Sequence, residues 1–241
     1  MSTRFLASVS NLQEAATILA AGADIIDIKD PARGALGAVD PVTLQMIVKK
    51  IGGQAITSAT IGDLPMQASK IAAGIGNVQC AGVDIIKIGI FSNTIPADVL
   101  KLIRETTAGG NRIVLVFFAD LKPDVDTFEL LADLGVYGVM LDTADKSNGS
   151  LRTILADNEL ESFIRSAQAA GLMAGLAGSL QQRDITPLLA LKPDYLGFRS
   201  ALCVKQQRKM HIDVHAVNQI RSMIPLENEH TEKITAMIQE V

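Results

Sequence analysis

The feature that most constrains this chain is an eightfold alternation between short apolar runs and longer amphipathic segments. The short runs are rich in β-branched residues, whereas the longer segments repeat apolar residues every three or four positions and mostly end in glycine. Strands that alternate with helices are typical of right-handed βαβ units and of a parallel sheet buried on both faces. We therefore expect eight strands, at residues 5–9, 24–29, 55–61, 84–90, 112–119, 138–143, 173–178 and 195–200.

Eight strand–helix units favour a closed barrel over a doubly wound open sheet. A chain of 241 residues is close to the roughly 250 residues of a typical barrel, so we predict a (β/α)8 TIM barrel, as a single domain over 1–241. An extra C-terminal helix is expected in the amphipathic segment 226–241, where it would cover the side of the barrel or form a subunit contact. A doubly wound open sheet is the alternative; it would be favoured by a G-x-G-x-x-G turn after the first strand, which "SVSNLQEA" lacks.

A second regularity accompanies the strands. The segments "AGAD", "AGVD", "LGVYG" and "LKPDY" precede every second expected strand and resemble a helix-to-strand corner repeated four times.

The composition indicates a small-molecule partner. Lysine and arginine number 22 against 26 acidic residues, and the resulting net charge of −4 provides no basic field for nucleic acid or an anionic membrane. No apolar run reaches the roughly 18 residues of a membrane span, and the N-terminus lacks a secretory pattern. Cys80 and Cys203 lie far apart without metal-ligand spacing. We expect a cytoplasmic protein with no metal site.

Two charged residues interrupt the second apolar run, "ADIIDIKDPARGALGA". Side chains alternate across a strand, so Asp27 and Lys29 share one face while Ile26 and Ile28 take the other. The isoleucines suit the interface with the helices, so the two charges should point into the barrel, where a pair costs less than isolated charges. Because catalytic groups of TIM barrels lie at the carboxyl ends of the strands, this pair indicates a candidate active site.

The fourth expected strand repeats the pattern, because "VDIIKIG" places Lys87 between isoleucines. Two inward lysines on nearby strands repel each other, and a cationic neighbour together with desolvation lowers a lysine pKa from about 10.4. A neutral lysine amine is a nucleophile toward carbonyls, so the pair indicates Schiff-base chemistry. The alternative is that each lysine merely pairs with a carboxylate, Lys29 with Asp27 and Lys87 with an Asp of another strand.

Further polar candidates follow the sixth strand in "MLDTADKSNGS". Asp142 closes the strand, and Lys146 follows four residues later in a glycine-containing loop. A carboxylate and a flexible lysine at this spacing could relay protons or hold a substrate phosphate. For Lys146, a solvated loop lysine is the alternative.

Small residues near the last two strands indicate a phosphate site. "GLAGSLQQRDI" runs from the seventh strand into a helix through Gly178 and Ser179, and "YLGFRSALC" supplies Gly197 and Arg199 at the eighth. Small residues let backbone N–H groups approach an anion, and TIM barrels often bind phosphate with these loops. The alternative is that the glycines serve tight packing between strand and helix.

Taken together, these segments resemble a known family. "ADIIDIKDPARGALGA", "SATIGD", "DIIKIGIF", "GVMLDTADKSNGSL", "GLAGSL" and "DYLGFRSALC" are similar to segments of the (5-formylfuran-3-yl)methyl phosphate synthases, also called 4-(hydroxymethyl)-2-furancarboxaldehyde-phosphate synthases, of methanofuran biosynthesis and C1 metabolism. The resemblance runs in family order from about residue 4 to residue 203. The family commonly has Asn where this chain has Asp30.

The resemblance implies a lyase that condenses two glyceraldehyde 3-phosphate molecules to a furan aldehyde phosphate, with loss of phosphate and water. It implies that Lys29 is the Schiff-base residue, that Lys87 accepts a proton, and that Asp27, Asp142 and Lys146 assist. An iminium serves as the electron sink, so no cofactor is expected. The expected partner is the small phosphorylated substrate rather than nucleic acid or a membrane, and a homo-oligomer is left open.

Two other functions remain open at this point. A class I aldolase acting on phosphorylated sugars would use the same lysines and stop before the aromatic ring forms. A non-catalytic barrel that binds a phosphorylated metabolite would need the phosphate site alone.

Overall fold

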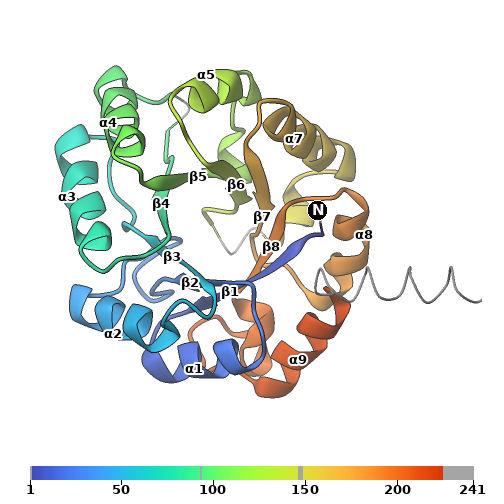
Figure 1. Ribbon diagram of the computed structural model, residues 1–241. Helices are drawn as coiled ribbons and strands as arrows, with labels where there is room; N and C mark the ends of the chain where they lie inside the picture. The colour runs from blue at the N-terminus through green and yellow to red at the C-terminus, as the bar shows by residue number, and fades with distance from the viewer. Residues whose placement is uncertain (1, 93, 146–148, 225–241) are drawn as a thin grey trace, which may run out of the picture.

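The computed structural model describes residues 2–92, 94–145 and 149–224, and these fold into a closed barrel of eight parallel strands in the order β1 to β8 (Figure 1). The strands are β1 (Arg4–Val9), β2 (Ile25–Ile28), β3 (Ile56–Thr60), β4 (Ile85–Gly89), β5 (Arg112–Phe118), β6 (Gly138–Asp142), β7 (Met173–Leu176) and β8 (Tyr195–Phe198). The closed barrel confirms the predicted TIM fold, and the open-sheet alternative is wrong.

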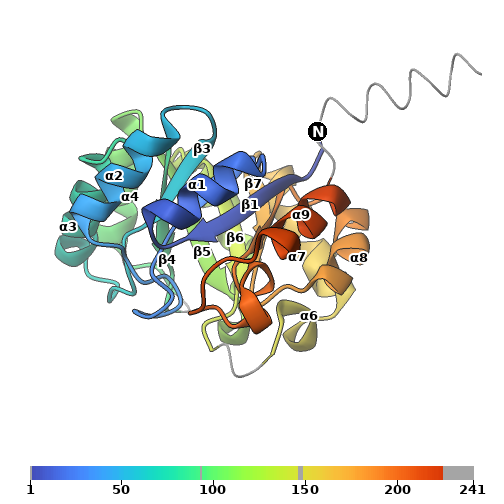
Figure 2. The ribbon, with the colours of Figure 1, turned by 90° about the horizontal axis from the view of Figure 1, so that it is seen from below.

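The helices form an outer ring around the strands (Figure 1). They are α1 (Leu12–Ala20), α2 (Pro41–Ile51), α3 (Ala68–Gln79), α4 (Ala97–Ala108), α5 (Phe128–Asp133), α6 (Leu151–Ile154), α7 (Asp157–Ala169), α8 (Ile185–Ala190) and α9 (Val214–Met223). Side chains cap several of them: Asn11 and Asp40 accept hydrogen bonds from N–H groups in the first turns of α1 and α2. The start of β1 lies at the end of the barrel opposite to α6, which belongs to the loops after the strands (Figure 2).

Alternation along β2 follows the prediction. Ile26 and Ile28 belong to the apolar cluster between the strands and the helices, whereas Ile25 belongs to the cluster inside the barrel. Asp27 therefore points inward from the same face as Ile25. The strand places its charges in the barrel because its isoleucines are needed against the helices.

The repeated corners have a common structural basis. Three of them carry an aspartate whose carboxylate accepts a hydrogen bond from a backbone N–H near the start of the previous strand. The pairs are Asp24 with Phe5 (2.7 Å), Asp84 with Thr57 (2.8 Å) and Asp194 with Ala174 (2.7 Å). These bonds join neighbouring strands at the end of the barrel away from the candidate active site, so they serve stability.

The C-terminal part of the chain is described up to residue 224. A C-terminal helix, α9, follows β8 and packs against the turn at Ser200–Leu202. The segment 226–241 lies outside the described residues, and the single-domain assignment over 1–241 stays a prediction. Among the described residues, no helix has the length and apolar character needed to span a membrane.

Gly138 gives a test of the strand packing. Its strand neighbour is Met173, and a Cβ at position 138 would lie 2.7 Å from the carbonyl oxygen of Met173. Gly138→Ala should therefore lower the free energy of unfolding by about 1–3 kcal/mol, because backbone must move to make room. Gly76→Ala is the control: it lies in α3 with nothing within 4 Å, and it should stabilise the helix by about 0.5–1 kcal/mol. Thermal and denaturant unfolding compare the variants, and equal melting temperatures for both would contradict this account.

Candidate active site

Two lysines share one buried carboxylate inside the barrel. The Nζ of Lys87 lies 3.0 Å from Oδ1 of Asp27, and the Nζ of Lys29 lies 3.9 Å from Oδ2 of the same carboxylate. Asp27 is 0 % exposed, Lys87 2 % and Lys29 6 %. The structure thus brings together the three residues that the sequence predicted, from β2, the end of β2 and β4.

Serine hydroxyls on both neighbouring strands complete the shell around Asp27. Ser8 of β1 and Ser58 of β3 are its partners in the sheet register, and they donate hydrogen bonds of 3.1 Å and 2.7 Å to its two oxygens. Sequence reasoning missed both serines. The signal was a serine on the inward face of each of the two strands that flank β2.

Burial and the charge of the ion-pair partner shift the pKa values of Asp27 and Lys87 in opposite directions. Burial alone would raise the pKa of the Asp27 carboxyl, but the positive charges of Lys87 and Lys29 and the hydrogen bond from Ser58 lower it below its usual value of 3.8. Burial lowers the pKa of the Lys87 ammonium from 10.5; Asp27 opposes this shift and Lys29 adds to it. A lowered pKa at Lys87 favours a neutral amine that can accept a proton.

Asp142 adds a second carboxylate beside Lys29. Its Oδ2 lies 3.8 Å from the Lys29 Nζ, and its Oδ1 accepts a hydrogen bond of 2.7 Å from the backbone N–H of Thr143. Asp142 is 2 % exposed, so this ion pair is buried. Lys146, the other candidate in this loop, lies outside the described residues.

A small cavity opens above these carboxylates and contains most of the remaining candidates. Lys29, Asp142, Gly178, Ser179, Gly197 and Arg199 all line it, together with Arg208. Gly178 and Ser179 form the turn after β7 with φ values of +100° and +52°, and Gly197 is inward on β8, where a Cβ would lie 2.9 Å from Met140. Lys29 therefore lines the same cavity as the predicted phosphate turn. Tight packing, the alternative for the glycines, also holds at Gly197, and at Gly178, where a Cβ would lie 2.9 Å from Cγ2 of Thr143.

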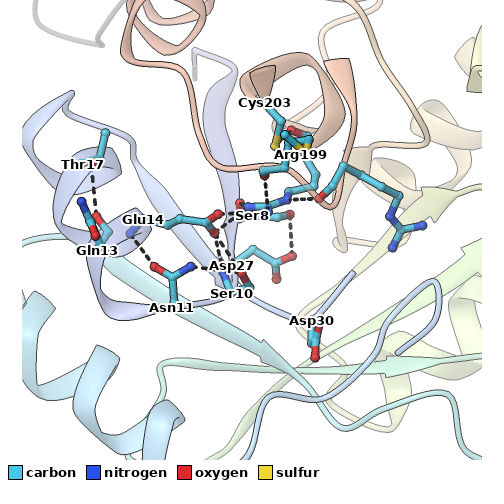
Figure 3. A network of polar contacts seen from close by, with 12 residues as sticks. Ser8, Ser10, Asn11, Gln13, Glu14, Thr17, Asp27, Asp30, Arg199 and Cys203 are labelled. Carbon is cyan, nitrogen blue, oxygen red and sulfur yellow. Dashed lines mark hydrogen bonds and ion pairs between the residues drawn. The ribbon is translucent and has the colours of Figure 1, made fainter. Parts of the chain in front are cut away.

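Arg199 faces this cavity but is engaged by the protein (Figure 3). It forms a buried ion pair with Glu14 at 2.6 Å and 3.1 Å, in which both side chains are less than a tenth exposed. Its other N–H groups donate to the carbonyl oxygens of Ser8 (3.2 Å), Arg208 (2.8 Å) and Met210 (3.3 Å). A guanidinium has five N–H donors, and these contacts use all of them. Its predicted role as a phosphate ligand stays a prediction, with Glu14 as the partner that the sequence did not reveal.

The loop after β2 packs into the interior of the barrel. Asp63 accepts hydrogen bonds from the backbone N–H groups of Ala35 (2.9 Å) and Leu36 (2.7 Å), and Leu36 is fully buried in the cluster inside the barrel. Asp30 accepts a hydrogen bond from the N–H of Ala32 and forms an ion pair with Arg33 at 3.5 Å. The loop is therefore anchored to the barrel by Asp63 and by the burial of Leu36.

Asp27→Asn tests the shared carboxylate. The substitution leaves two buried amines without their common counter-ion and should destabilise the fold by about 3–5 kcal/mol. Because the pKa of Asp27 is lowered on folding, its stabilising contribution is present above its usual value of 3.8 and is lost as the pH falls through the lower folded value. Thermal unfolding should thus show a gap between wild type and variant that persists from about pH 7 to about pH 5 and closes only below about pH 4.

Asp40→Asn is the matched control for this experiment. Asp40 caps α2 at an exposed position, and Asn caps helices equally well, so the melting temperature should change little. A gap for Asp27→Asn that closes already between about pH 7 and about pH 5 would contradict the lowered pKa.

Comparison with known proteins places the chain in one family. The family model described as 4-HFC-P synthase matches residues 5–221. The chain is 31 % identical to the (5-formylfuran-3-yl)methyl phosphate synthase of Methanopyrus kandleri over 86 % of this chain and 92 % of that protein. It is 32 % identical to the same-named protein of Methanothermobacter thermautotrophicus over 91 % and 98 %. A Methylorubrum extorquens protein, which carries this name provisionally, is 43 % identical over 87 % and 86 %.

Solved structures share the fold at much lower identity. Phosphoribosyl anthranilate isomerase from Thermus thermophilus superposes with a TM-score of 0.66 at 13 % identity, covering 92 % of this chain and 98 % of that one. A 3-hexulose-6-phosphate synthase gives the same TM-score at 14 % identity, covering 92 % and 100 %. These likenesses support the barrel alone, whereas the family match extends over the strands that carry Asp27, Lys29, Lys87 and Asp142. The chain belongs to the 4-HFC-P synthase family.

Proposed function

We propose that the protein condenses two molecules of glyceraldehyde 3-phosphate to 4-(hydroxymethyl)-2-furancarboxaldehyde phosphate, with loss of phosphate and water. One observation carries the proposal: Lys29 and Lys87 share the buried carboxylate of Asp27, and of these two lysines Lys29 lines the cavity. The relatives named as (5-formylfuran-3-yl)methyl phosphate synthases support the assignment. By the same resemblance the product would feed methanofuran biosynthesis in the cytoplasm.

The first step is capture of a ketone. One triose phosphate is isomerised to its ketone, and the amine of Lys29 adds to the carbonyl carbon and expels water to form an iminium. The nearby carboxylates of Asp27 and Asp142 stabilise the cationic iminium and assist the proton transfers that release the water. Lys29 is suited to this role because it lines the cavity and lies beside both carboxylates.

The second step forms the carbon–carbon bond. A base removes the proton next to the iminium carbon, and the resulting enamine attacks the aldehyde of the second triose. Lys87 is the proposed base, because its lowered pKa favours the neutral amine and Asp27 holds it in place at 3.0 Å. Loss of phosphate, ring closure and loss of water then give the aromatic aldehyde, and hydrolysis frees Lys29. The iminium is the electron sink throughout.

Incubation with glyceraldehyde 3-phosphate tests the proposal. The wild type should generate the ultraviolet absorbance of a furan aldehyde together with inorganic phosphate. Borohydride should trap an adduct on Lys29, which mass spectrometry locates. Lys29→Arg keeps the charge but cannot form an iminium, so turnover should fall on the order of a thousand-fold or more. Lys101→Arg on the exposed face of α4 is the matched control and should keep full activity.

Other outcomes point to other functions. Reversible aldol cleavage without furan absorbance would make the protein a class I aldolase acting on phosphorylated sugars. Binding of the triose without an adduct or turnover would make it a non-catalytic binding barrel. Full activity of Lys29→Arg would move the nucleophile to another residue.

A further inference from the structure

A phosphate that binds near Lys29 would be stabilised by a cation with free donors, and the donors of Arg199 are already engaged. Its five N–H groups all donate to Glu14 or to backbone carbonyls, and Glu14 neutralises its charge within the protein. To bind a phosphate, Arg199 would have to break a buried ion pair, which is unfavourable.

Arg208 differs from Arg199 in how few of its guanidinium donors the protein engages. It lines the same cavity as Lys29 and Asp142 and is half-buried. Its Nη2 donates a hydrogen bond of 2.7 Å to the carbonyl oxygen of Gly34, and within the described residues its guanidinium makes no other hydrogen bond and no ion pair. One of its five N–H groups is used to orient the guanidinium, and the others stay available to a ligand.

The same cavity also offers backbone donors. Gly178 and Ser179 line it, and within the described part of the chain their N–H groups have no backbone acceptor. Ser179 holds a positive φ of +52°, a conformation that is unfavourable for a side-chain-bearing residue and that clusters at ligand-binding turns. A guanidinium and free N–H groups around one cavity are the usual recognition chemistry for a phosphate dianion.

We propose that Arg208, with the N–H groups of Gly178 and Ser179, binds the phosphate of the triose that forms the iminium on Lys29, and that Arg199 positions Arg208. The positioning rests on two contacts: Arg199 donates to the carbonyl oxygens of Arg208 and Met210 and thereby fixes the loop that carries Arg208. This inference deepens the proposed function and rests on it for the identity of the ligand.

The test compares two ketones that differ only in the phosphate. Dihydroxyacetone phosphate and dihydroxyacetone are each titrated against the enzyme with borohydride, and the adduct on Lys29 is measured by mass spectrometry. The wild type should reach half-maximal trapping at a much lower concentration of the phosphorylated ketone. Arg208→Gln should raise that concentration about ten- to a hundred-fold and leave the dihydroxyacetone curve unchanged, because only a charge-assisted contact to phosphate is lost.

Two further variants distinguish phosphate binding by Arg208 from general attraction of anions and from the positioning role of Arg199. Arg183→Gln removes an exposed charge in the neighbouring surface groove and should leave both curves unchanged, which controls for general attraction of anions. Arg199→Lys should raise the half-saturating concentration of the phosphorylated ketone less than Arg208→Gln does. In the Arg208→Gln background, Arg199→Lys should not raise this concentration further, because a positioning residue acts only through the residue that it positions.

Binding of inorganic phosphate, measured by calorimetry, distinguishes the two possible failures. Trapping on Lys29 with an unchanged preference for the phosphorylated ketone in Arg208→Gln would overturn this inference and leave the proposed function standing. Equal losses for both ketones would also overturn it, because they would show a structural role. No adduct on Lys29, with phosphate binding that still depends on Arg208, would overturn the proposed function and support the phosphate site.

Discussion

The shared carboxylate of Asp27 is the interaction on which the site depends. Two lysines inside a barrel would repel each other and lose their hydration, and Asp27 offsets both effects by lying within 4 Å of each Nζ. The carboxylate itself is stabilised by hydroxyls from the strands on both sides. This arrangement fixes the two amines at one level of the barrel while burial keeps the pKa of Lys87 low. Stability and reactivity therefore depend on the same group.

The two ends of the proposed substrate site are linked through one residue. Ser8 donates its hydroxyl hydrogen to Asp27, and its carbonyl oxygen accepts a hydrogen bond from Arg199 (Figure 3). Arg199 in turn holds the loop of Arg208, whose guanidinium donates a hydrogen bond to Gly34 in the loop after β2. The amine end and the phosphate end are thus positioned by one continuous set of hydrogen bonds. A fixed distance between them favours a ligand of one length.

The fold alone does not account for this chemistry. Solved barrels at 13–14 % identity share the architecture of this chain. What gives the site its character is the set of charged residues at inward positions where a barrel usually places aliphatic side chains. Polar residues that break the apolar pattern of a strand were therefore the most informative part of the sequence.

The sequence by itself determined the eight strands, the barrel, and the inward direction of Asp27 and Lys29, because strand periodicity and the demand for apolar contact with the helices are local properties. It also indicated the family through motifs along the chain. The tertiary structure alone decided which groups meet: Ser8 and Ser58 around Asp27, Glu14 with Arg199, and Arg208 in the cavity. Those partners are distant in sequence, and only barrel closure and the strand register bring them within bonding distance. The sequence shows that Arg199 lies near the end of a strand. Only the tertiary structure shows that its N–H donors are already bonded to Glu14 and to backbone carbonyls.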